Sequence, residues 1–432
     1  MLETENQYLL SIYKLGLDFA LEQDQNDELS SYRNQFYIPK DKNGNDCIYM
    51  TGNSLGLQPK QTKTYVNQEL KDWANLGVEG HFKAKNPWLD YHAYLGKSMA
   101  QIVGAKPIEV VVMNTLTANL HFMMASFFKP TKTRYKILIE ADAFPSDKYA
   151  VESQLRHHGF DDKEGLILWK ARKGEELANY KDLEAILETQ GNDIALILIG
   201  AVNYYTGQFF DLKRITELGH KHGCLVGFDC AHGAGNVALN LHDSGADFAA
   251  WCTYKYLNSG PGSIAACFVH ERHAYNKNLN RFTGWWSHNK ETRFKMRDTF
   301  DQLPGAEGWQ LSNPPILSMA AIRASLDIFK DVGIEKLIQK SKKQTGYFEF
   351  LLKQLGEDSI RIITPSNPNE RGCQLSIAVK NANKSLHNKL TEAGVISDWR
   401  EPNVIRCAPV PLYNSFQDIY YLVERLKAIL NE

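Results

Sequence analysis

The sequence predicts an α/β protein whose larger part is a mostly parallel sheet covered by helices on both faces. Unbroken apolar runs recur along the middle of the chain, as in YKILIEADAF, GLILWKA, DIALILIGAV and CLVGFDC. Such runs are typical of strands buried on both faces of a parallel sheet. Segments of helical character separate them, and this alternation of strand and helix indicates right-handed crossover connections.

The length of the chain and its C-terminal pattern predict a second, smaller domain. A chain of 432 residues exceeds the usual size of one hydrophobic core. We expect residues 1–50 to form an N-terminal segment that joins the small domain, residues 51–315 the large domain, and residues 316–432 a small α+β domain.

The elements are expected in the following order along the chain. Residues 1 to about 35 are expected to be helical, residues 48–56 to form a short strand and turn, and residues 60–76 a helix. Strands are expected within 135–144, 165–171, 193–202, 224–230, 246–252 and 263–269, with helices at 145–159, 179–190 and 211–222. A long helix from residue 317, a strand at 372–379, a helix near 387–393 and a strand that carries Arg406 complete the chain.

Composition excludes several classes of function. The 49 basic and 50 acidic residues give a net charge of -1, which offers no attraction for nucleic acid or an anionic membrane. The seven cysteines contain no CxxC pair and suit neither a disulfide framework nor a zinc site. The sequence shows no signal peptide and no apolar run of about 20 residues, so a cytoplasmic location without a membrane span is expected.

The strongest chemical signal lies between Asp229 and Lys255. Asp229 and His232 follow one apolar run, and Tyr254 and Lys255 follow the next. The ends of neighbouring parallel strands meet at one edge of a sheet, where ligands of α/β proteins bind. A carboxylate and a lysine amine at this edge are the two groups that pyridoxal phosphate requires. An ordinary surface lysine and a strand-ending aspartate are the alternative.

Other candidate residues have equally ordinary explanations. Asn114, Thr115 or Thr117 can cap the helix that follows, and the same helix start can bind a phosphate. Phe144 can stack on a flat cofactor or lie in the core. Arg406 suits a substrate carboxylate but is equally typical of a surface strand. No third ligand accompanies Asp229 and His232, so no metal is expected.

Nine segments give the chain a resemblance to the kynureninase family of pyridoxal-phosphate enzymes. They extend from about Gly52 to Ser415 and read NTLTANLH, FPSDKYA, YYTGQ, VGFDCAHGAGNV, TYKYLNSGPG, TRFKM, SNPPIL, RGCQL and APVPLYNSF. The resemblance implies the fold-type I pyridoxal-phosphate architecture, with a seven-stranded sheet in the large domain. It also implies a homodimer with shared active sites.

The resemblance further implies a role for each candidate residue. Lys255 would bind the cofactor covalently and move the α-proton, Asp229 would hold the pyridinium nitrogen, and Tyr254 would donate a proton. The residues implied around the cofactor are Leu116, Thr117, Phe144, Pro145, Ser146, Asp147, Asp229, His232, Tyr254 and Lys255, with Trp285 and Asn313 from the second subunit. Those implied for the substrate are His81, Ser312, Asn313 and Arg406.

The implied reaction is hydrolytic cleavage of the Cβ–Cγ bond of L-kynurenine or 3-hydroxy-L-kynurenine, which yields L-alanine and an anthranilate. His81, Ser312 and Asn313 resemble the form of the family that favours the 3-hydroxy substrate, which we treat as a hypothesis. Gly200 departs from the serine expected near the phosphate in some members, so one hydroxyl contact is in doubt.

Three alternatives compete with this interpretation. A cysteine desulfurase needs a mobile reactive thiol, whereas Cys373 lies at the start of an apolar run and is expected to be buried. An aminotransferase is a second alternative. A non-catalytic protein that binds pyridoxal phosphate is the third, although Lys255 and Asp229 are both present.

Overall fold

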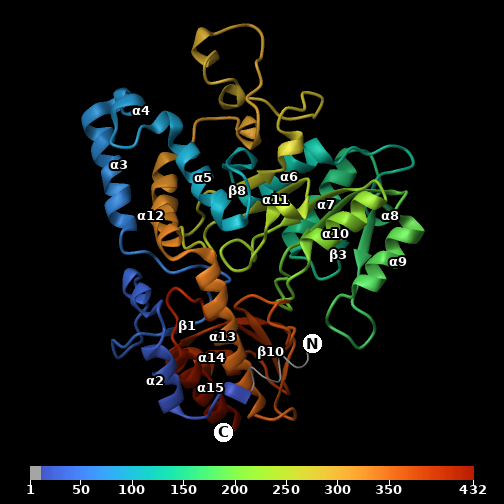
Figure 1. Ribbon diagram of the computed structural model, residues 1–432. Helices are drawn as coiled ribbons and strands as arrows, with labels where there is room; N and C mark the ends of the chain where they lie inside the picture. Colours follow the sequence, from blue (N-terminus) through green and yellow to red (C-terminus); the bar gives the residue numbers. More distant parts are fainter. Residues whose placement is uncertain (1–10) are drawn as a thin grey trace.

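The computed structural model describes residues 11–432, and a seven-stranded α/β sheet is its largest element (Figure 1). The first ten residues of the predicted N-terminal helix lie outside the described range. The sheet has the strand order β2-β8-β7-β6-β5-β3-β4. Its strands are β2 (Val110–Val112), β3 (Lys136–Glu140), β4 (Leu166–Trp169), β5 (Ile194–Gly200), β6 (Leu225–Asp229), β7 (Phe248–Trp251) and β8 (Ala266–Val269).

All neighbours in this sheet are parallel except those of β8, which runs antiparallel to both β2 and β7. The predicted mostly parallel sheet is therefore confirmed. Strand β2 was not predicted, because three apolar residues are too few to distinguish a strand from other buried chain.

Helices cover both faces of the sheet, as the apolar runs require. Alternate residues of β3 show the division: Ile137 and Ile139 pack with α6 and α7, whereas Leu138 packs in the core shared with α5 and α12. The helices of this part are α3 (Thr62–Leu76), α4 (Gly80–Lys83), α5 (Tyr91–Val103), α6 (Leu116–Phe127), α7 (Pro145–His157), α8 (Asp162–Gly165), α9 (Tyr180–Gln190), α10 (Leu212–Lys221), α11 (Leu241–Ser244) and α12 (Ile316–Val332).

A four-stranded antiparallel sheet lies below the large sheet in Figure 1, with the order β12-β13-β10-β9. Its strands are β9 (Ile360–Ile362), β10 (Leu375–Val379), β12 (Asp398–Arg400) and β13 (Val404–Cys407), and α13 (Ile334–Lys353), α14 (Lys384–Glu392) and α15 (Phe416–Leu430) accompany it. The hydrophobic core of this part includes Phe19, Ile48 and Met50 from the N-terminal segment. The domain boundaries at residues 51 and 316 stay a prediction.

The described residues of the N-terminal segment, from residue 11 onwards, are less helical than predicted. Helix α2 spans only Leu17–Gln25, and a 3-10 helix follows at Ser30–Gln35. Gly16 precedes α2 with a φ of 100°, a conformation that favours glycine, so it separates α2 from the residues before it. Strand β1 (Ile48–Tyr49) then pairs in parallel with β11 (Val395–Ile396), which ties this segment to the C-terminal part.

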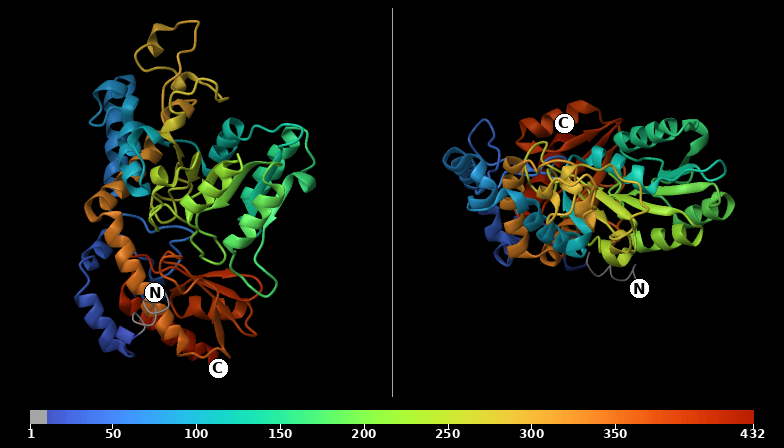
Figure 2. Two further views of the ribbon diagram at one scale, coloured as in Figure 1. Left: turned by 45° about the vertical axis from the view of Figure 1, so that its right-hand side comes forward. Right: turned by 90° about the horizontal axis from the view of Figure 1, so that it is seen from above.

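The segment between β8 and α12 stands out from the rest of the chain (gold in Figure 1 and in both views of Figure 2). It contains 3-10 turns of three or four residues but no strand or α-helix. Several large apolar side chains on it are exposed, including Tyr275, Phe282, Trp285, Phe294 and Met296. Such a cluster of exposed apolar side chains is typical of a surface that another protein covers.

All seven cysteines are buried and none forms a disulfide. No described helix has the length and apolar character needed to cross a membrane.

Candidate active site

A cavity of about 410 Å³ opens at the carboxyl ends of β3, β5 and β6. The last residues of these strands, Glu140, Gly200 and Asp229, line it. Arg406, from the small antiparallel sheet, lines the opposite side. The cavity therefore lies between the two sheets, at the strand ends where the sequence placed it.

Ten of the predicted site residues line this cavity together. They are Leu116, Thr117, Phe144, Ser146, Asp147, Asp229, His232, Tyr254, Lys255 and Arg406. Pro145 is the first residue of α7, between two of these residues, but does not itself line the cavity.

Four predicted residues lie outside the cavity of this single chain. His81 is on the short helix α4 against Trp88, and Trp285, Ser312 and Asn313 are exposed or partly exposed beyond it. Trp285 and Asn313 were expected from a second subunit. The roles of all four residues stay predictions.

Lys255 and His232 form the central polar contact of the cavity. The Nζ atom of Lys255 lies 2.9 Å from Nε2 of His232. Burial lowers the pKa of His232 well below its usual value, and the positive charges of Lys255, Arg406 and Arg400 lower it further. The imidazole is therefore neutral and accepts the hydrogen bond from the amine. Its buried Nδ1 has no partner among the described residues.

Three buried carboxyl groups also line the cavity. Burial raises the pKa of Asp147 well above its usual value, and the neighbouring charge of Asp229 raises it further. The two side chains are hydrogen-bonded, and burial also raises the pKa of Asp229. Because Asp147 binds its proton more tightly, it donates this hydrogen bond and Asp229 accepts it. Asp229 also accepts from the backbone N–H of Ala231 at 2.7 Å.

Glu140 is the third of these carboxyl groups, and sequence reasoning missed it. Burial raises its pKa to about 7. Both of its oxygens accept from the backbone N–H of Gly200 at 3.1 Å. A Cβ atom on residue 200 would lie 2.7 Å from Oε1 of Glu140. Gly200, where a serine was expected in some members of the family, thus leaves room for this carboxyl group.

Two helix N-termini meet at the far end of the cavity. Helix α6 begins after Thr115 and helix α7 after Phe144, and neither has a side-chain cap. The hydroxyls of Thr117 and Ser146 lie 3.0 Å apart between them. Side-chain capping, which was the alternative for the first helix, is therefore not observed. Uncapped first-turn N–H groups beside two hydroxyls are suited to bind an anion such as a phosphate.

The donor set fits pyridoxal phosphate. Lys255 offers an amine for the aldehyde, Asp229 a buried carboxylate for the ring nitrogen, and the paired helix starts a site for the phosphate. The Nζ atom of Lys255 lies 5.8 Å from the ring centre of Phe144, whose side chain is 45% exposed and borders the cavity. A planar ring between them would cover this aromatic face.

Arg406 is the buried cation of the cavity wall. Its side chain is 2% exposed, and its guanidinium is paired with Asp398. Its Nε atom is buried without a hydrogen-bond partner among the described residues. A guanidinium group in a cavity wall is suited to an anionic ligand, a carboxylate above all.

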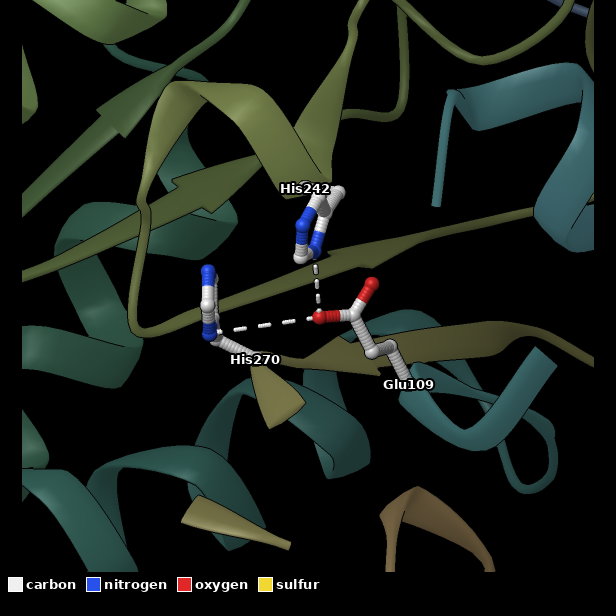
Figure 3. Close-up of side chains that lie close together, drawn as sticks. All are labelled: Glu109, His242 and His270. Atoms are coloured by element: carbon white, nitrogen blue, oxygen red, sulfur yellow. Dashed lines mark hydrogen bonds and ion pairs between the residues drawn. The ribbon is translucent and has the colours of Figure 1, made fainter. Parts of the chain in front are cut away.

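A second cluster of polar residues lies outside the cavity, where Glu109 approaches His242 and His270 (Figure 3). Oε1 of Glu109 accepts from Nδ1 of His242 at 2.9 Å and from the N–H of Glu271 at 2.8 Å, and Oε2 accepts from the N–H of Lys106 at 2.8 Å. The two imidazole rings are stacked with an angle of 21° between their planes. Lone pairs in two nearly parallel planes do not converge on one ion, so we interpret the cluster as a hydrogen-bond network between chain segments.

The thiol that a desulfurase would need is absent from the cavity wall. Cys373 is 1% exposed, and its Sγ contacts Oδ1 of Asn236 at 3.0 Å. Burial raises its pKa to about 12, so it is neither mobile nor ionised at neutral pH. This geometry does not favour the desulfurase alternative.

Solved structures with the same fold support the architecture. A structure of C-DES, a cystine C–S lyase, with glycine covalently linked to its pyridoxal-phosphate cofactor has a TM-score of 0.77 at 17% identity, covering 91% of this chain and 98% of its own. A cysteine desulfurase from Escherichia coli has a TM-score of 0.72 at 15% identity, covering 94% of this chain and 98% of its own. At these identities the likeness concerns the fold alone, which is the fold-type I architecture predicted from the sequence.

Curated relatives are much closer in sequence. A kynureninase from Myxococcus xanthus is 54% identical over 96% of this chain and 97% of its own length. Kynureninases from Flavobacterium psychrophilum and Mus musculus are 53% and 46% identical, over 96% and 95% of this chain and 98% and 93% of their own lengths. The family model described as the kynureninase C-terminal domain matches residues 337–426. Given this identity over nearly its full length, the chain belongs to the kynureninase family of pyridoxal-phosphate enzymes.

Proposed function

We propose that the protein cleaves the Cβ–Cγ bond of L-kynurenine, of 3-hydroxy-L-kynurenine or of both. Water supplies the hydroxyl of the carboxyl group on the released anthranilate, and a proton on Cβ completes the methyl group of L-alanine. The observation that carries the proposal is the cavity that Lys255, Asp229 and Arg406 line together. Membership of the kynureninase family supports it.

Bound pyridoxal phosphate supplies an electron sink for the negative charge that develops at the carbon atoms of the substrate. Lys255 would hold its aldehyde carbon, and Asp229 would hold the proton of its ring nitrogen. Asp147 supports Asp229 by donating a hydrogen bond to it. Thr117, Ser146 and the starts of α6 and α7 would bind the phosphate.

Lys255 would move the proton at Cα of the substrate, and His232 would assist it. The neutral imidazole of His232 accepts from the lysine amine, which orients the amine and lowers the cost of moving a proton from it. Tyr254 lies next to Lys255, and burial raises the pKa of its phenol. It therefore holds its proton at neutral pH and suits the role of donor to Cβ.

The carboxylate of the substrate would pair with Arg406. Arg406 lines the cavity, and its guanidinium is suited to pair with a carboxylate. His81, Ser312 and Asn313 would contact the aromatic end of the substrate. Their hydrogen bonds to the 3-hydroxyl would favour the 3-hydroxy substrate over kynurenine. Because these residues lie outside the cavity of one chain, the proposal includes a homodimer that completes the site. It keeps the cytoplasmic location expected from the sequence.

A product assay on protein reconstituted with pyridoxal phosphate tests the proposal. L-Kynurenine and 3-hydroxy-L-kynurenine are supplied separately, and L-alanine and the fluorescent anthranilate are measured. We expect both products in equal amounts, with a higher kcat/KM for the 3-hydroxy substrate. The Lys255→Ala variant, with cofactor added, should form neither product. Failure of the wild-type holoenzyme to cleave either substrate would refute the proposed function, while preference for kynurenine would refute only the roles of His81, Ser312 and Asn313.

A further inference from the structure

Strand pairing places two arginines on one carboxylate at the cavity wall. Asp398 on β12 lies directly opposite Arg406 on β13, and Arg400 follows Asp398 by two residues, on the same face of the strand. Oδ2 of Asp398 accepts from Nη2 of Arg406, and Oδ1 accepts from Nη1 of Arg400 at 2.9 Å. One carboxylate is therefore shared between two guanidinium groups.

The charges of these three residues do not cancel. Two guanidinium groups and one carboxylate leave a single positive charge, and both arginines line the cavity. Arg400 is 35% exposed, but Arg406 is only 2% and Asp398 13% exposed, so water screens the charge of Arg406 poorly. A buried unbalanced charge is costly unless an ion of opposite sign joins it. A carboxylate is the anion that best matches a guanidinium group.

Arg406 itself is fixed in place from two sides. Besides Asp398, the carbonyl oxygen of Tyr204 accepts a hydrogen bond from its Nη1. The same carbonyl accepts from Nε2 of Gln374 at 3.1 Å, and Gln374 is held in turn by Asn53 at 2.8 Å. These contacts hold Arg406 beside Asp398 in the cavity wall.

We propose that Arg400 determines the specificity of this site for ligands that carry a carboxylate. By holding Oδ1 of Asp398, Arg400 prevents that carboxylate from neutralising Arg406 alone. The positive charge that remains is then available to the carboxylate of an α-amino acid. The inference rests on the proposed function in one respect, namely that the ligand of Arg406 is an α-amino acid.

Binding of a matched ligand pair to the holoenzyme tests this role. L-Alanine and ethylamine differ only in the carboxylate, and their Kd values follow from the change they cause in the visible absorbance of the cofactor. In Arg400→Gln, Asp398 and Arg406 form a neutral pair, so we expect the Kd of L-alanine to rise about tenfold or more. The Kd of ethylamine should change less than about twofold.

A double variant tests whether Arg400→Gln loses affinity through the change in charge or through local disruption of the structure. The double variant Asp398→Asn with Arg400→Gln restores the net charge of +1, because Arg406 is then the remaining ion of the three. We expect its Kd for L-alanine to be at least about threefold lower than that of Arg400→Gln. Arg400→Lys keeps the charge and should bind L-alanine within about threefold of the wild type. Arg172→Gln removes a surface arginine paired with Asp182 and should leave both Kd values unchanged.

Two results would overturn the inference. Equal losses of affinity for L-alanine and ethylamine in Arg400→Gln would show that Arg400 only supports the fold. A double variant that binds L-alanine no better than Arg400→Gln would show that charge balance is not the cause. Neither measurement requires turnover, so a wild-type protein that binds L-alanine but does not cleave kynurenine would refute the proposed function and leave this inference standing.

Discussion

Glu140 shows how one residue links the sheet to the chemistry of the cavity. It is the last residue of β3 and is 4% exposed, with Gly200 at the end of the neighbouring strand β5 as its donor. Two other carboxyl groups, Asp229 and Asp142, raise its pKa in addition to burial. A carboxyl group in this position remains partly protonated at neutral pH.

The pKa of Glu140 has a consequence for stability. Its pKa is about 7 in the folded protein against 4.5 in the unfolded chain. Between these values the folded protein retains a proton that the unfolded chain has released, so stability falls as pH rises from 4.5 to 7. The loss is on the order of 3 kcal/mol. Glu140→Gln has no such proton to lose, and its stability relative to the wild type should rise from pH 5 to pH 8.

Urea unfolding of Glu140→Gln and the wild type at both pH values measures this difference. Asp161→Asn, which removes an exposed carboxylate far from the cavity, serves as the comparison and should show no such trend. If the free energies of unfolding of Glu140→Gln and the wild type differ by the same amount at both pH values, the raised pKa of Glu140 is contradicted.

Sequence reasoning identified the residues whose chemistry is distinctive and missed those whose role depends on burial. Lys255 and Asp229 were found because an amine and an acid follow consecutive apolar runs. Glu140 and Asp398 carry no such signal, since a glutamate or aspartate at a strand end is common. Their importance arises from what lies opposite them, namely Gly200 and Arg406.

At the level of elements, β6 and β7 fix the position of Asp229. Gly227 on β6 pairs with Phe248 on β7, and the phenyl ring of Phe248 lies over the glycine. A Cβ atom on residue 227 would lie 2.1 Å from Cζ of that ring. Phe248 is fully buried and stacks on Phe127 at 5.1 Å, so it has little room to move.

Gly227→Ala should therefore destabilise the protein by about 1–3 kcal/mol, the usual cost of overpacking a core. It should also weaken retention of the cofactor, because β6 ends at Asp229. Thermal unfolding and cofactor titration measure the two effects. Phe248→Leu creates space at the same contact, so the losses of the double variant should be smaller than the sum of the single losses. Strictly additive losses would contradict this account of the contact.

The sequence predicted the strands of the large sheet well because unbroken apolar runs leave few alternatives. The antiparallel placement of β8 did not follow from its sequence, since its run of apolar residues resembles those of the parallel strands. The pairing of β12 with β13 was also not predictable. Both strands are short, and the charged residues that face each other are separated only by the turn between them.

At the level of the whole molecule, the proposed site draws on residues that lie outside the cavity of a single chain. Trp285 and Asn313 were expected from a second subunit, and the segment that carries Trp285 projects from the body of the chain (Figures 1 and 2). Exposed side chains on this segment and on α3 and α4, such as Trp73 and Phe82, provide apolar surface that a second copy would bury.

Mixing two inactive variants tests whether sites are shared. If Asn313 of one subunit serves the Lys255 of the other, a hybrid of Lys255→Ala and Asn313→Ala contains one intact site and one doubly altered site. Random reassortment makes half of the dimers hybrids, so the mixture should regain about a quarter of the wild-type activity. Each variant alone, denatured and refolded in the same way, provides the control. A mixture no more active than its components would exclude sharing of this kind.

The buried cysteines can report local opening of the hydrophobic cores. Cys230 and Cys267 lie in the cores on the two faces of the large sheet, and Cys407 lies in the core of the small sheet. Burial raises the pKa of each of these thiols above its usual value. An alkylating reagent therefore reacts with a thiol only when the core around it opens. The order in which the three thiols become labelled therefore records which layer of the protein opens first, without any engineered residue.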